Sequence, residues 1–497
     1  MAAPRGTDQA PDLEVRMQRI SRRQFVVTLA AASRVWGANG DVRLGVIGVG
    51  STVKGGGKGK ADARAFLKIP GVRVVAFCDP DHANLDPEVE QFAKDGYKIE
   101  PYTDLRKLLD NKDIDAVCVT PPNHWHALAT IWACQAGKDV FVEKPASHNI
   151  FEGRKMVEAA QKYGRIVCCT SNSRAPNGYR EALQYAFEGQ LGKISYVYGV
   201  NFNARTSIGK VSGPQPIPKS LDYDLWSGPA PVLPLMREFL HYDWHWIWDY
   251  GDGDLGNMGI HTLDGCRMAV RQDGLPKHVM TFGGRFAYTD DGQTPNTELI
   301  FLDYQPAPII FQVRGLPHDK SLLATAWNKN YKETMDDYRG VRIGVVVQCE
   351  GGYIAANRAF DKNGSLIREF KSPNPTEHAA FIQAVRSRRS SDLLGDVLQG
   401  HLSASLVHMG NISYRLGKVA APGEIQERIG GRRDLKTIYE GMQEHLLANG
   451  VDVNKMVAGP MLTMDSDREQ FTGEFSEEAN KLLSRHYRKP FVVPEKV

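Results

Sequence analysis

The sequence predicts an α/β protein with an N-terminal domain on a doubly wound parallel sheet and a C-terminal α+β domain with a large, predominantly antiparallel sheet. Between residues 41 and 170, short apolar runs alternate with helix-like stretches, as in a parallel sheet covered by helices. Beyond that point, strand-like runs follow one another with few helices between them. We therefore expect a first domain over 41–170 and a second over 171–420, with a leading segment, 1–40, and an extension, 421–497.

The composition is that of an ordinary globular protein. The chain has 497 residues, of which 42% are hydrophobic and 24% charged, which is enough for two packed domains. Its 61 basic and 58 acidic residues leave a net charge of +3 and are interspersed. Since no basic patch stands out, we expect no nucleic-acid partner.

The leading segment resembles a twin-arginine export signal. Arg22 and Arg23 precede a short apolar run, 25–32, which Arg34 closes. The run is far shorter than the about 20 residues of a membrane-spanning helix, so no stable membrane insertion is expected. We predict a periplasmic or otherwise exported protein, with a basic tail on a cytoplasmic protein as the alternative. Met17 offers an alternative start to Met1.

The seven cysteines are odd in number and form no CxxC pair. Two of them, Cys78 and Cys118, lie within strand-like apolar runs. We expect buried free thiols rather than disulfides.

A strand, helix, strand unit opens the first domain. Gly48 and Gly50 follow the first apolar run and allow a tight turn with close approach to a pyrophosphate. Val53 stands where the third glycine of such a motif is expected, and the stretch KGGGKGK, residues 54–60, predicts an expanded loop. Asp79 ends the second strand, where a carboxylate accepts hydrogen bonds from ribose hydroxyls and repels a 2′-phosphate. NAD is therefore expected, and NADP less so.

Two more predicted strands end in polar and proline-rich sequence. TPPNHWHA begins at Thr120, and VEKPAS follows a strand that ends at Val142. Ligands bind at the carboxyl ends of strands in an open parallel sheet, so these residues should line one groove. A metal site at His124 and His126 is not expected, because no carboxylate or cysteine nearby completes a ligand set.

These motifs resemble the Gfo/Idh/MocA oxidoreductases, whose nucleotide-binding Rossmann domain carries a Glu-Lys-Pro motif, and the resemblance extends from about residue 42 to the C-terminus. It implies that Glu143 contacts the nicotinamide ribose and that Lys144 lies between nicotinamide and substrate. It also implies that Pro145 fixes the turn through a cis bond. The remaining groove residues that it implies are Thr120, Pro121, Asn123 and His126. Without the motif, Lys144 would be interpreted as a surface lysine.

A tryptophan-rich stretch of the second domain suits a sugar. Aromatic faces stack on sugar rings, and we expect Trp244 and His245 to bind substrate. For Trp246 and Trp248, packing in the core is an equal alternative. His241 and His245 have the spacing of a metal pair on a helix, but no metal is expected.

The stretch GDLGNMGIHTLDG, residues 253–265, predicts a loop that enters a helix. The resemblance implies a catalytic histidine here, with an aspartate four positions before it. His261 matches the histidine, whereas Asn257 replaces the aspartate, so it can orient a group but carries no charge. We expect His261 to accept the hydroxyl proton, Lys144 to polarise the same oxygen, and Asp264 to orient the imidazole, although helix pairing would explain Asp264 equally well.

A long helix is predicted near residues 398–417, with His401, His408 and Arg415 on a solvated polar face rather than at the domain junction. The extension is expected to be ordered and to wrap the first domain or a neighbouring subunit. An open face of the second sheet predicts a homo-oligomer.

Three functions remain open. The first is NAD-dependent oxidation of a secondary hydroxyl of a sugar, glycoside or cyclic polyol by hydride transfer. The second is an NAD-dependent glycosidase that oxidises a hydroxyl, eliminates the aglycone, adds water and reduces the product again. The third is a non-catalytic NAD-binding carbohydrate sensor, against which the pairing of Lys144 with His261 argues.

Overall fold

The computed structural model describes residues 40–51, 56–171, 174, 177–324 and 331–497. Residues 42–497 form one compact unit. The export motif at Arg22 and Arg23, the alternative start at Met17, and Val53 lie outside the described residues. Along the described chain, no helix is both long enough and apolar enough to cross a membrane.

The first sheet is parallel, and its strand order is β3-β2-β1-β4-β5-β6 among the described residues. Its strands are β1 (Val42–Ile47), β2 (Val72–Cys78), β3 (Glu100–Tyr102), β4 (Ala116–Val119), β5 (Asp139–Val142) and β6 (Val167–Cys169). The order reverses between β1 and β4, which is where a doubly wound sheet binds ligands. The predicted fold of this domain is confirmed.

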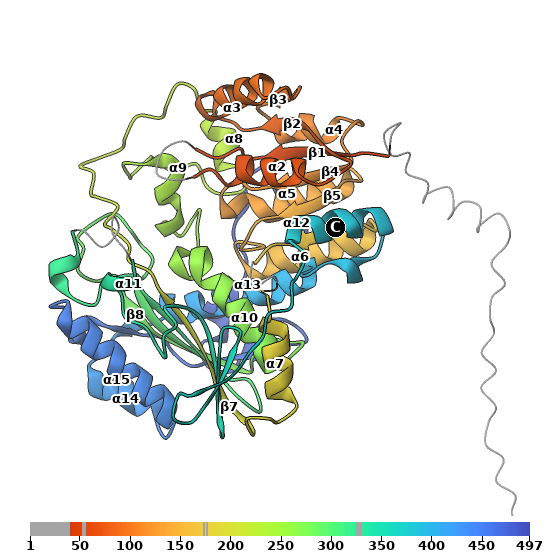
Figure 1. The fold of residues 1–497 in the computed structure, drawn as a ribbon. Coiled ribbons are helices and arrows are strands. Elements are labelled where there is room, and N and C mark those ends of the chain that lie inside the picture. Colours follow the sequence, from red (N-terminus) through yellow and green to blue (C-terminus); the bar gives the residue numbers. More distant parts are fainter. Residues whose placement is uncertain (1–39, 52–55, 172–173, 175–176, 325–330) are drawn as a thin grey trace, which may run out of the picture. The chain divides into compact units, whose positions relative to one another are not determined.

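Helices of the first domain cover this sheet (Figure 1), and those in its described residues are α2 (Lys58–Leu67), α3 (His82–Lys94), α4 (Leu105–Asp110), α5 (Asn123–Gln135) and α6 (Ile150–Lys162). Side chains just before three of them accept a backbone N–H of the first turn, namely Asp81, Asp104 and Asn149. Such caps accept hydrogen bonds from amides that have no partner within the helix. The local sequence therefore determines where these helices begin.

The second sheet is mixed and mostly antiparallel, and it has twelve strands in the described part of the chain. They are β7 (Ile194–Phe202), β8 (His278–Gly284), β9 (Thr297–Leu302), β10 (Ile309–Arg314), β11 (Ile343–Cys349), β12 (Gly352–Ala355), β13 (Arg358–Asp361), β14 (Leu366–Glu369), β15 (Lys418–Val419), β16 (Val457–Ala458), β17 (Leu462–Asp465) and β18 (Gln470–Thr472). Only the β7–β10 pairing is parallel among these strands. The predicted antiparallel character is confirmed.

Helices lie on both sides of this second sheet (Figure 1). The helices of this part of the chain are α7 (Tyr179–Phe187), α8 (Tyr223–Ser227), α9 (Leu240–Asp243), α10 (Ile260–Val270), α11 (Tyr331–Thr334), α12 (Glu377–Ser387), α13 (Val397–Arg415), α14 (Pro422–Ile429), α15 (Arg433–Ala448) and α16 (Ser476–Lys481). Leu435, Tyr439 and Met442 of α15 pack on Phe282 and Phe301 of the sheet. The prediction of an open sheet face is wrong there, because the extension itself covers that face.

Helix α13 lies at the junction of the two sheets, where it packs against α6 on one side and β8 on the other. His401 is fully buried and pairs with Glu469 of the extension, and His408 is buried beside Asp252. The prediction of a solvated polar face is therefore wrong, because these histidines gain partners from segments distant in sequence.

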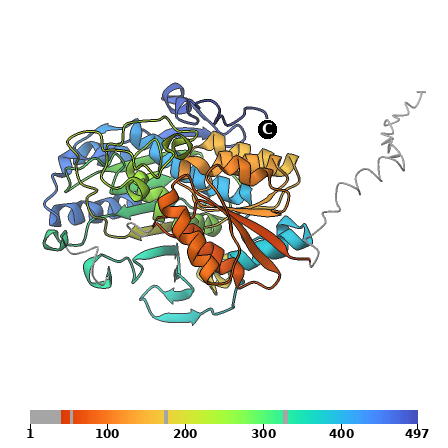
Figure 2. The same ribbon diagram turned by 90° about the horizontal axis from the view of Figure 1, so that it is seen from above.

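Later segments also complete the first domain, where the helix drawn in cyan lies beside the red and orange elements (Figure 2). On α12, His378 and Phe381 pack against Phe66 and Phe141 of the first domain. Near the C-terminus, Phe491 packs edge-on against Trp125 of α5 and is 1% exposed. The extension thus lies against the first domain.

We predict that Phe491→Ala lowers the free energy of unfolding by about 3–5 kcal/mol, because it leaves a cavity against Trp125. Urea unfolding measures the change. The neighbouring Val492 is 39% exposed, so Val492→Ala should change stability by less than about 0.5 kcal/mol. Equal effects of both substitutions would show that the tail does not anchor the first domain.

Candidate active site

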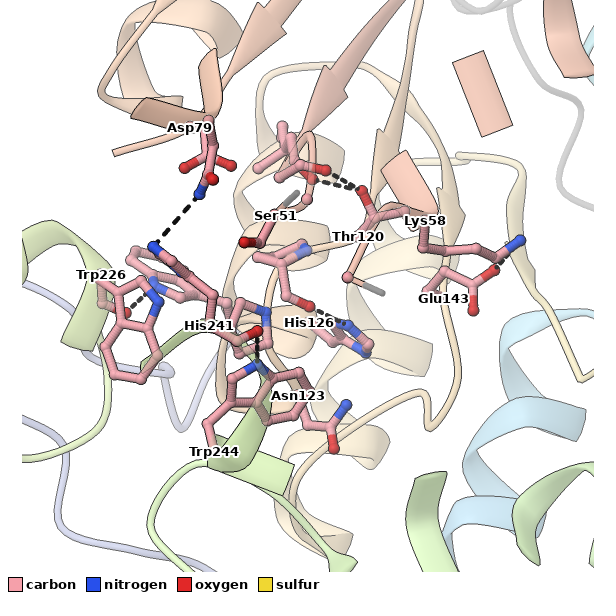
Figure 3. Close-up of a pocket in the computed structure, with 18 of the residues that line it drawn as sticks. Ser51, Lys58, Asp79, Thr120, Asn123, His126, Glu143, Trp226, His241 and Trp244 are labelled. Carbon is pink, nitrogen blue, oxygen red and sulfur yellow. Dashed lines mark hydrogen bonds and ion pairs between the residues drawn. The ribbon is translucent and has the colours of Figure 1, made fainter. Parts of the chain in front are cut away.

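A cavity of about 410 Å³ opens at the carboxyl ends of β1 and β4. Both domains contribute to its walls. The first domain supplies Gly48, Gly50, Ser51, Lys58, Asp79, Thr120, Asn123, His126, Glu143 and Lys144; the second supplies Arg205, Trp226, His241, Tyr242, Trp244, His245, Asn257 and His261. Figure 3 shows Trp226, His241 and Trp244 on the side opposite the Lys58–Glu143 pair.

Glycines form a close-packed turn at one end of the cavity. A Cβ on Gly48 would lie 2.6 Å from the Pro121 nitrogen, and one on Gly50 would lie 2.2 Å from the Gly56 oxygen. Helix α2 begins only at Lys58, and a Cβ on Gly59 would lie 2.0 Å from the Gly48 oxygen. Gly59 therefore packs the helix against the turn, which is the role of the third glycine in such a motif.

Asp79 lies at the end of β2 beside this turn. Its carboxylate accepts hydrogen bonds from the backbone N–H groups of Val49, at 3.1 Å, and Asp81, at 3.0 Å. Burial raises its pKa, while these N–H groups act in the opposite direction. The carboxylate is thus fixed at the wall where a ribose would lie.

The end of β4 forms the floor of the cavity. Thr120 donates to the Gly48 oxygen at 2.5 Å. The ring nitrogens of His126 lie 2.8 Å from the Pro121 oxygen and 2.6 Å from the Pro145 oxygen, so this histidine joins the loops after β4 and β5. Asn123 is buried, and its Oδ1 has no hydrogen-bond partner among the described residues. That orphaned acceptor and the glycine turn fit a bound dinucleotide.

Glu143 is buried and held on two sides. It accepts a hydrogen bond from the Thr170 hydroxyl at 2.9 Å and pairs with the Lys58 ammonium at 3.1 Å. Burial opposes the charge on Lys58, but the carboxylates of Glu143 and Asp62 outweigh it and raise the pKa of that lysine. The sequence prediction did not include Lys58, although a lysine inside the glycine-rich stretch was a signal for it.

Lys144 contacts the second domain directly. The Lys144–Pro145 bond is cis, as the resemblance implied. The segment before α10 forms one turn of π-helix, η2 (Leu255–Gly259), here called the π-turn, rather than a plain loop. Within it, Asn257 accepts from the Lys144 ammonium through its backbone oxygen at 2.5 Å and through Oδ1 at 3.1 Å. A π-turn interrupts the regular helical hydrogen bonding, and such turns are frequent at functional sites.

Both acceptors of Lys144 are neutral, so nothing in this contact compensates its charge. Burial lowers the pKa of Lys144 to about 8, although Glu143 acts to raise it. About half of Lys144 is therefore uncharged near pH 8, and a smaller part at neutral pH. This is the range in which a lysine exchanges protons with a substrate hydroxyl.

His261 lies in the first turn of α10, and its tautomer is fixed. Its Nδ1 is 2.6 Å from the Ser171 carbonyl oxygen, which only accepts, so Nδ1 carries the hydrogen and Nε2 is the acceptor of the neutral ring. Burial, and then the charge of Lys144, hold the pKa of His261 below its ordinary value. His261 is therefore a hydrogen-bond acceptor and a weak base.

Asp264 does not orient the imidazole, and that prediction is wrong. Its carboxylate accepts from Arg174 at 2.8 and 2.9 Å, from the Ser171 hydroxyl at 2.5 Å and from Ser403 at 2.6 Å. Although His261 and Asp264 are three apart on one helix, the carboxylate is turned toward α13. Ser171 contacts both residues, because its hydroxyl donates to Asp264 and its carbonyl oxygen accepts from His261.

The predicted sugar-binding residues line the cavity near Lys144. The rings of Trp244 and His245 are stacked with centroids 3.7 Å apart. His245 donates from Nδ1 to the Tyr242 oxygen at 2.5 Å, and burial lowers its pKa to about 3, so it is neutral. Arg205 and Tyr242, which the sequence prediction did not include, lie beside them. We call Lys144, Asn257, His261, Arg205, Tyr242, Trp244 and His245 the substrate end of the cavity.

Residues 220–246 of the second domain, here termed the cover segment, are attached to the first domain above the cavity. Asp222 donates its backbone N–H to the Pro80 oxygen at 2.9 Å, and His241 pairs with Asp81 at 2.7 Å. Trp226 is buried against His124, so it is a packing residue although its edge reaches the cavity. Trp246, another of the tryptophans, is buried as well.

The described residues contain no group of three or more His, Cys, Asp or Glu side chains that could hold a metal ion. All seven cysteines are buried free thiols, as predicted.

The fold and the cavity together define an α/β protein that binds a dinucleotide and places a lysine and a histidine beside it. Residues 42–171 match the model of an oxidoreductase family with an NAD-binding Rossmann fold, and residues 191–283 match that of the family's C-terminal α/β domain. Over residues 42–283, the chain is therefore similar to both domains of this oxidoreductase family. The predicted NAD-binding domain is thereby confirmed.

Known relatives differ in the reactions that their names describe. An inositol 2-dehydrogenase of Salmonella paratyphi B is 30% identical over 188 residues, which is 37% of this chain and 52% of the relative. A glycosyl hydrolase family 109 protein of a Shewanella species is 36% identical over 126 residues, which is 24% of this chain and 26% of the relative. The chain thus spans about half the length of the first relative and about a quarter of the length of the second.

A solved structure shows the same fold. The WlbA dehydrogenase from Bordetella pertussis, in complex with NADH and UDP-GlcNAcA, superposes with a TM-score of 0.53 at 20% identity, covering 76% of this chain and 97% of that one.

We predict that Asn257→Asp raises the pKa of Lys144 by about one unit or more, because a carboxylate replaces a neutral acceptor of its ammonium. Labelling with acetic anhydride across a pH series, read by mass spectrometry, measures this, since only the uncharged amine reacts. In the original protein, labelling of Lys144 should rise near pH 8, and exposed lysines should react only near pH 10.4. An unchanged profile in the variant would contradict the contact.

Proposed function

We propose that the protein oxidises a secondary hydroxyl of a sugar, glycoside or cyclic polyol with bound NAD. The observation that carries this proposal is one cavity with a dinucleotide turn at one end and Lys144, Asn257 and His261 at the other. NAD, when bound, accepts a hydride from the carbinol carbon. The relatives named as an inositol dehydrogenase and a glycosyl hydrolase support a polyhydroxylated substrate.

Lys144, His261 and Asn257 have different roles in the proposed proton transfer. The uncharged amine of Lys144 takes the hydroxyl proton, because its pKa of about 8 makes it the stronger base of the pair. His261 accepts a hydrogen bond at Nε2 and so orients the substrate oxygen or its neighbour. Asn257 holds the lysine in place. Gly48, Gly50, Asp79, Thr120, Pro121, Asn123, His126 and Glu143 hold the cofactor, and Trp244 and His245 bind the sugar.

A second candidate is the redox-neutral glycosidase. The observation that favours it is the cover segment, whose His241 and Trp226 close over the cofactor half of the cavity. A ketone acidifies the neighbouring C–H, so the aglycone can be eliminated with a modest base, after which water adds and the hydride returns. A cofactor that stays bound suits this cycle, because NAD is regenerated in place.

Three further proposals rest on sequence alone or on general principles. Export by a twin-arginine route is supported by Arg22 and Arg23 before an apolar run. Assembly into a homo-oligomer is supported by the general prevalence of symmetric oligomers. A non-catalytic sensor is the third outcome to be tested.

One experiment separates these functions. Purified protein with bound NAD is incubated with a panel of p-nitrophenyl glycosides, and reduced nicotinamide and released nitrophenol are followed together. Accumulation of NADH supports a dehydrogenase, and release of nitrophenol without it supports the glycosidase. Lys144→Ala should lower kcat by about 10²–10⁴-fold, whereas Lys481→Ala, at an exposed helix position, should not. Sugar binding without any turnover would favour the sensor.

We predict that His241→Ala speeds NAD dissociation about tenfold, because it removes the hydrogen bond with Asp81 that attaches the cover segment to the first domain. Stopped-flow displacement of NADH, read by its fluorescence, gives the rate. The matched control is His278→Ala, which removes a similar pair, with Asp303, outside the cavity lining. If both variants release NADH at the rate of the original protein, the cover segment does not retain the cofactor.

A further inference from the structure

Lys58 joins two buried carboxylates at the wall of the cavity. It is the first residue of α2, and its ammonium lies 2.6 Å from Asp62 and 3.1 Å from Glu143. Figure 3 shows this ammonium at the Glu143 carboxylate. The two acidic side chains are only 2% and 8% exposed, whereas that of Lys58 is 46% exposed and lines the cavity. The lysine thus brings a positive charge to acids that are largely withdrawn from water.

Asp62 fixes the direction of the Lys58 side chain. It lies one turn further along α2, at the i, i+4 position where a carboxylate meets a lysine on the same face. On α12, His378 Nε2 lies 3.0 Å from the same oxygen of Asp62, so this carboxylate is itself held in place. A cation at the first position of a helix is opposed by the helix dipole. The carboxylates, and not the helix, therefore account for a lysine at this position.

Glu143 has two basic neighbours and pairs with only one of them. Its Oε1 contacts the Lys58 ammonium and accepts from the Thr170 hydroxyl, and its Oε2 accepts the backbone N–H of Lys144 at 3.2 Å. Among the ion pairs of the described residues, none joins this carboxylate to the Lys144 ammonium, which donates to Asn257 instead. The carboxylate beside the proposed base is thus paired with a different lysine.

The charges in the cavity agree with this pairing. Burial opposes ionisation of Glu143, but Lys58 and then Lys144 hold its pKa below the ordinary value. At Lys144, burial has the largest effect and lowers the pKa to about 8, whereas Glu143 acts to raise it. The other ionisable groups that face Lys144 are Arg205, Asp254, Lys58, His245 and His261. Lys58 therefore offsets, at the base, the charge of the adjacent carboxylate.

We propose that Lys58 is a positioning residue of the reaction, which keeps Glu143 ionised as an acceptor for the cofactor and turned away from the Lys144 ammonium. This inference rests on the proposed function, in which Lys144 takes the hydroxyl proton, and adds the group that keeps this lysine available as a base. Without Lys58, the Glu143 carboxylate pairs with the ammonium of Lys144, holds it protonated and draws it from Asn257. Lys58 acts through Glu143 and touches no reacting atom.

The first test measures the Lys144 amine itself in the purified full-length protein. Labelling with acetic anhydride across a pH series, read by mass spectrometry, should reach half its maximum near pH 8 in the original protein. In Lys58→Met this midpoint should rise by about one pH unit or more, because Glu143 then pairs with Lys144. Lys58→Arg keeps the charge, so the midpoint should stay within about half a pH unit. Lys58→Gln repeats the test should the methionine variant fail to fold.

Lys60→Met is the matched control, because Lys60 lies on the same helix and pairs with Glu88 at 2.6 Å, outside the cavity lining. It should leave the Lys144 midpoint unchanged. A double substitution tests whether Lys58 acts through Glu143. In Glu143→Gln protein, Lys58→Met should shift the midpoint by less than about 0.3 pH units, because no carboxylate remains there to pair with Lys144.

Turnover of the glycoside panel gives a second readout. Lys58→Met should lower kcat about tenfold at neutral pH and restore it to within about threefold near pH 10, where Lys144 again loses its proton. An unchanged labelling midpoint in Lys58→Met, or an equal rise in Lys60→Met, would overturn the inference. Weaker NAD binding with an unchanged midpoint would also overturn it, since Lys58 would then be a cofactor contact only. No turnover of any glycoside by the original protein would instead overturn the proposed function, while the labelling result would still stand.

Discussion

The contact between Lys144 and Asn257 is the interaction on which the cavity depends, because it joins the end of β5 in the first sheet to the π-turn of the second domain. The carboxyl ends of the strands of the first sheet line the cofactor end of the cavity. The second domain must therefore bring its residues to that edge. The π-turn does so by presenting a backbone oxygen and a side-chain oxygen to the same ammonium, which fixes the distance between the two domains where the chemistry takes place.

The fold could be predicted from the sequence where local signals decide it. The buried strands of the first sheet are continuous apolar runs, and side-chain caps such as Asp104 mark helix starts, so both are visible in the chain. The role of Gly59 was missed because the motif places its third glycine by residue number, at position 53. In the folded chain the glycine that packs against Gly48 comes six residues later, after the glycine-rich stretch. The burial of His401 was missed because its partner, Glu469, is 68 residues away in the sequence. Helical periodicity predicts which residues share a face of the helix but not which distant segment packs against that face.

The residues of the candidate site could also be predicted only in part. The motif around Lys144 and the spacing of Asn257 and His261 located these groups, because residue types and their order can be seen in the sequence. The direction of a side chain cannot be seen there, and Asp264 was therefore assigned to the wrong partner. Arg205 belongs to no sequence motif, so its place in the cavity lining could not be predicted. Only the folded chain shows that Arg205 lines the cavity and that its counter-ion, Asp254, lies outside the lining.

Asn257 has a consequence for the chemistry that extends beyond its own contact. An aspartate at this position would place a negative charge beside Lys144, hold that lysine protonated, and strengthen His261 as a base. With an amide in its place, burial lowers the pKa of both groups, and the charge of Lys144 lowers the pKa of His261 further. The amide of Asn257 adds no charge that would oppose either shift, and under the proposed function the lysine is therefore the group that gains and loses a proton.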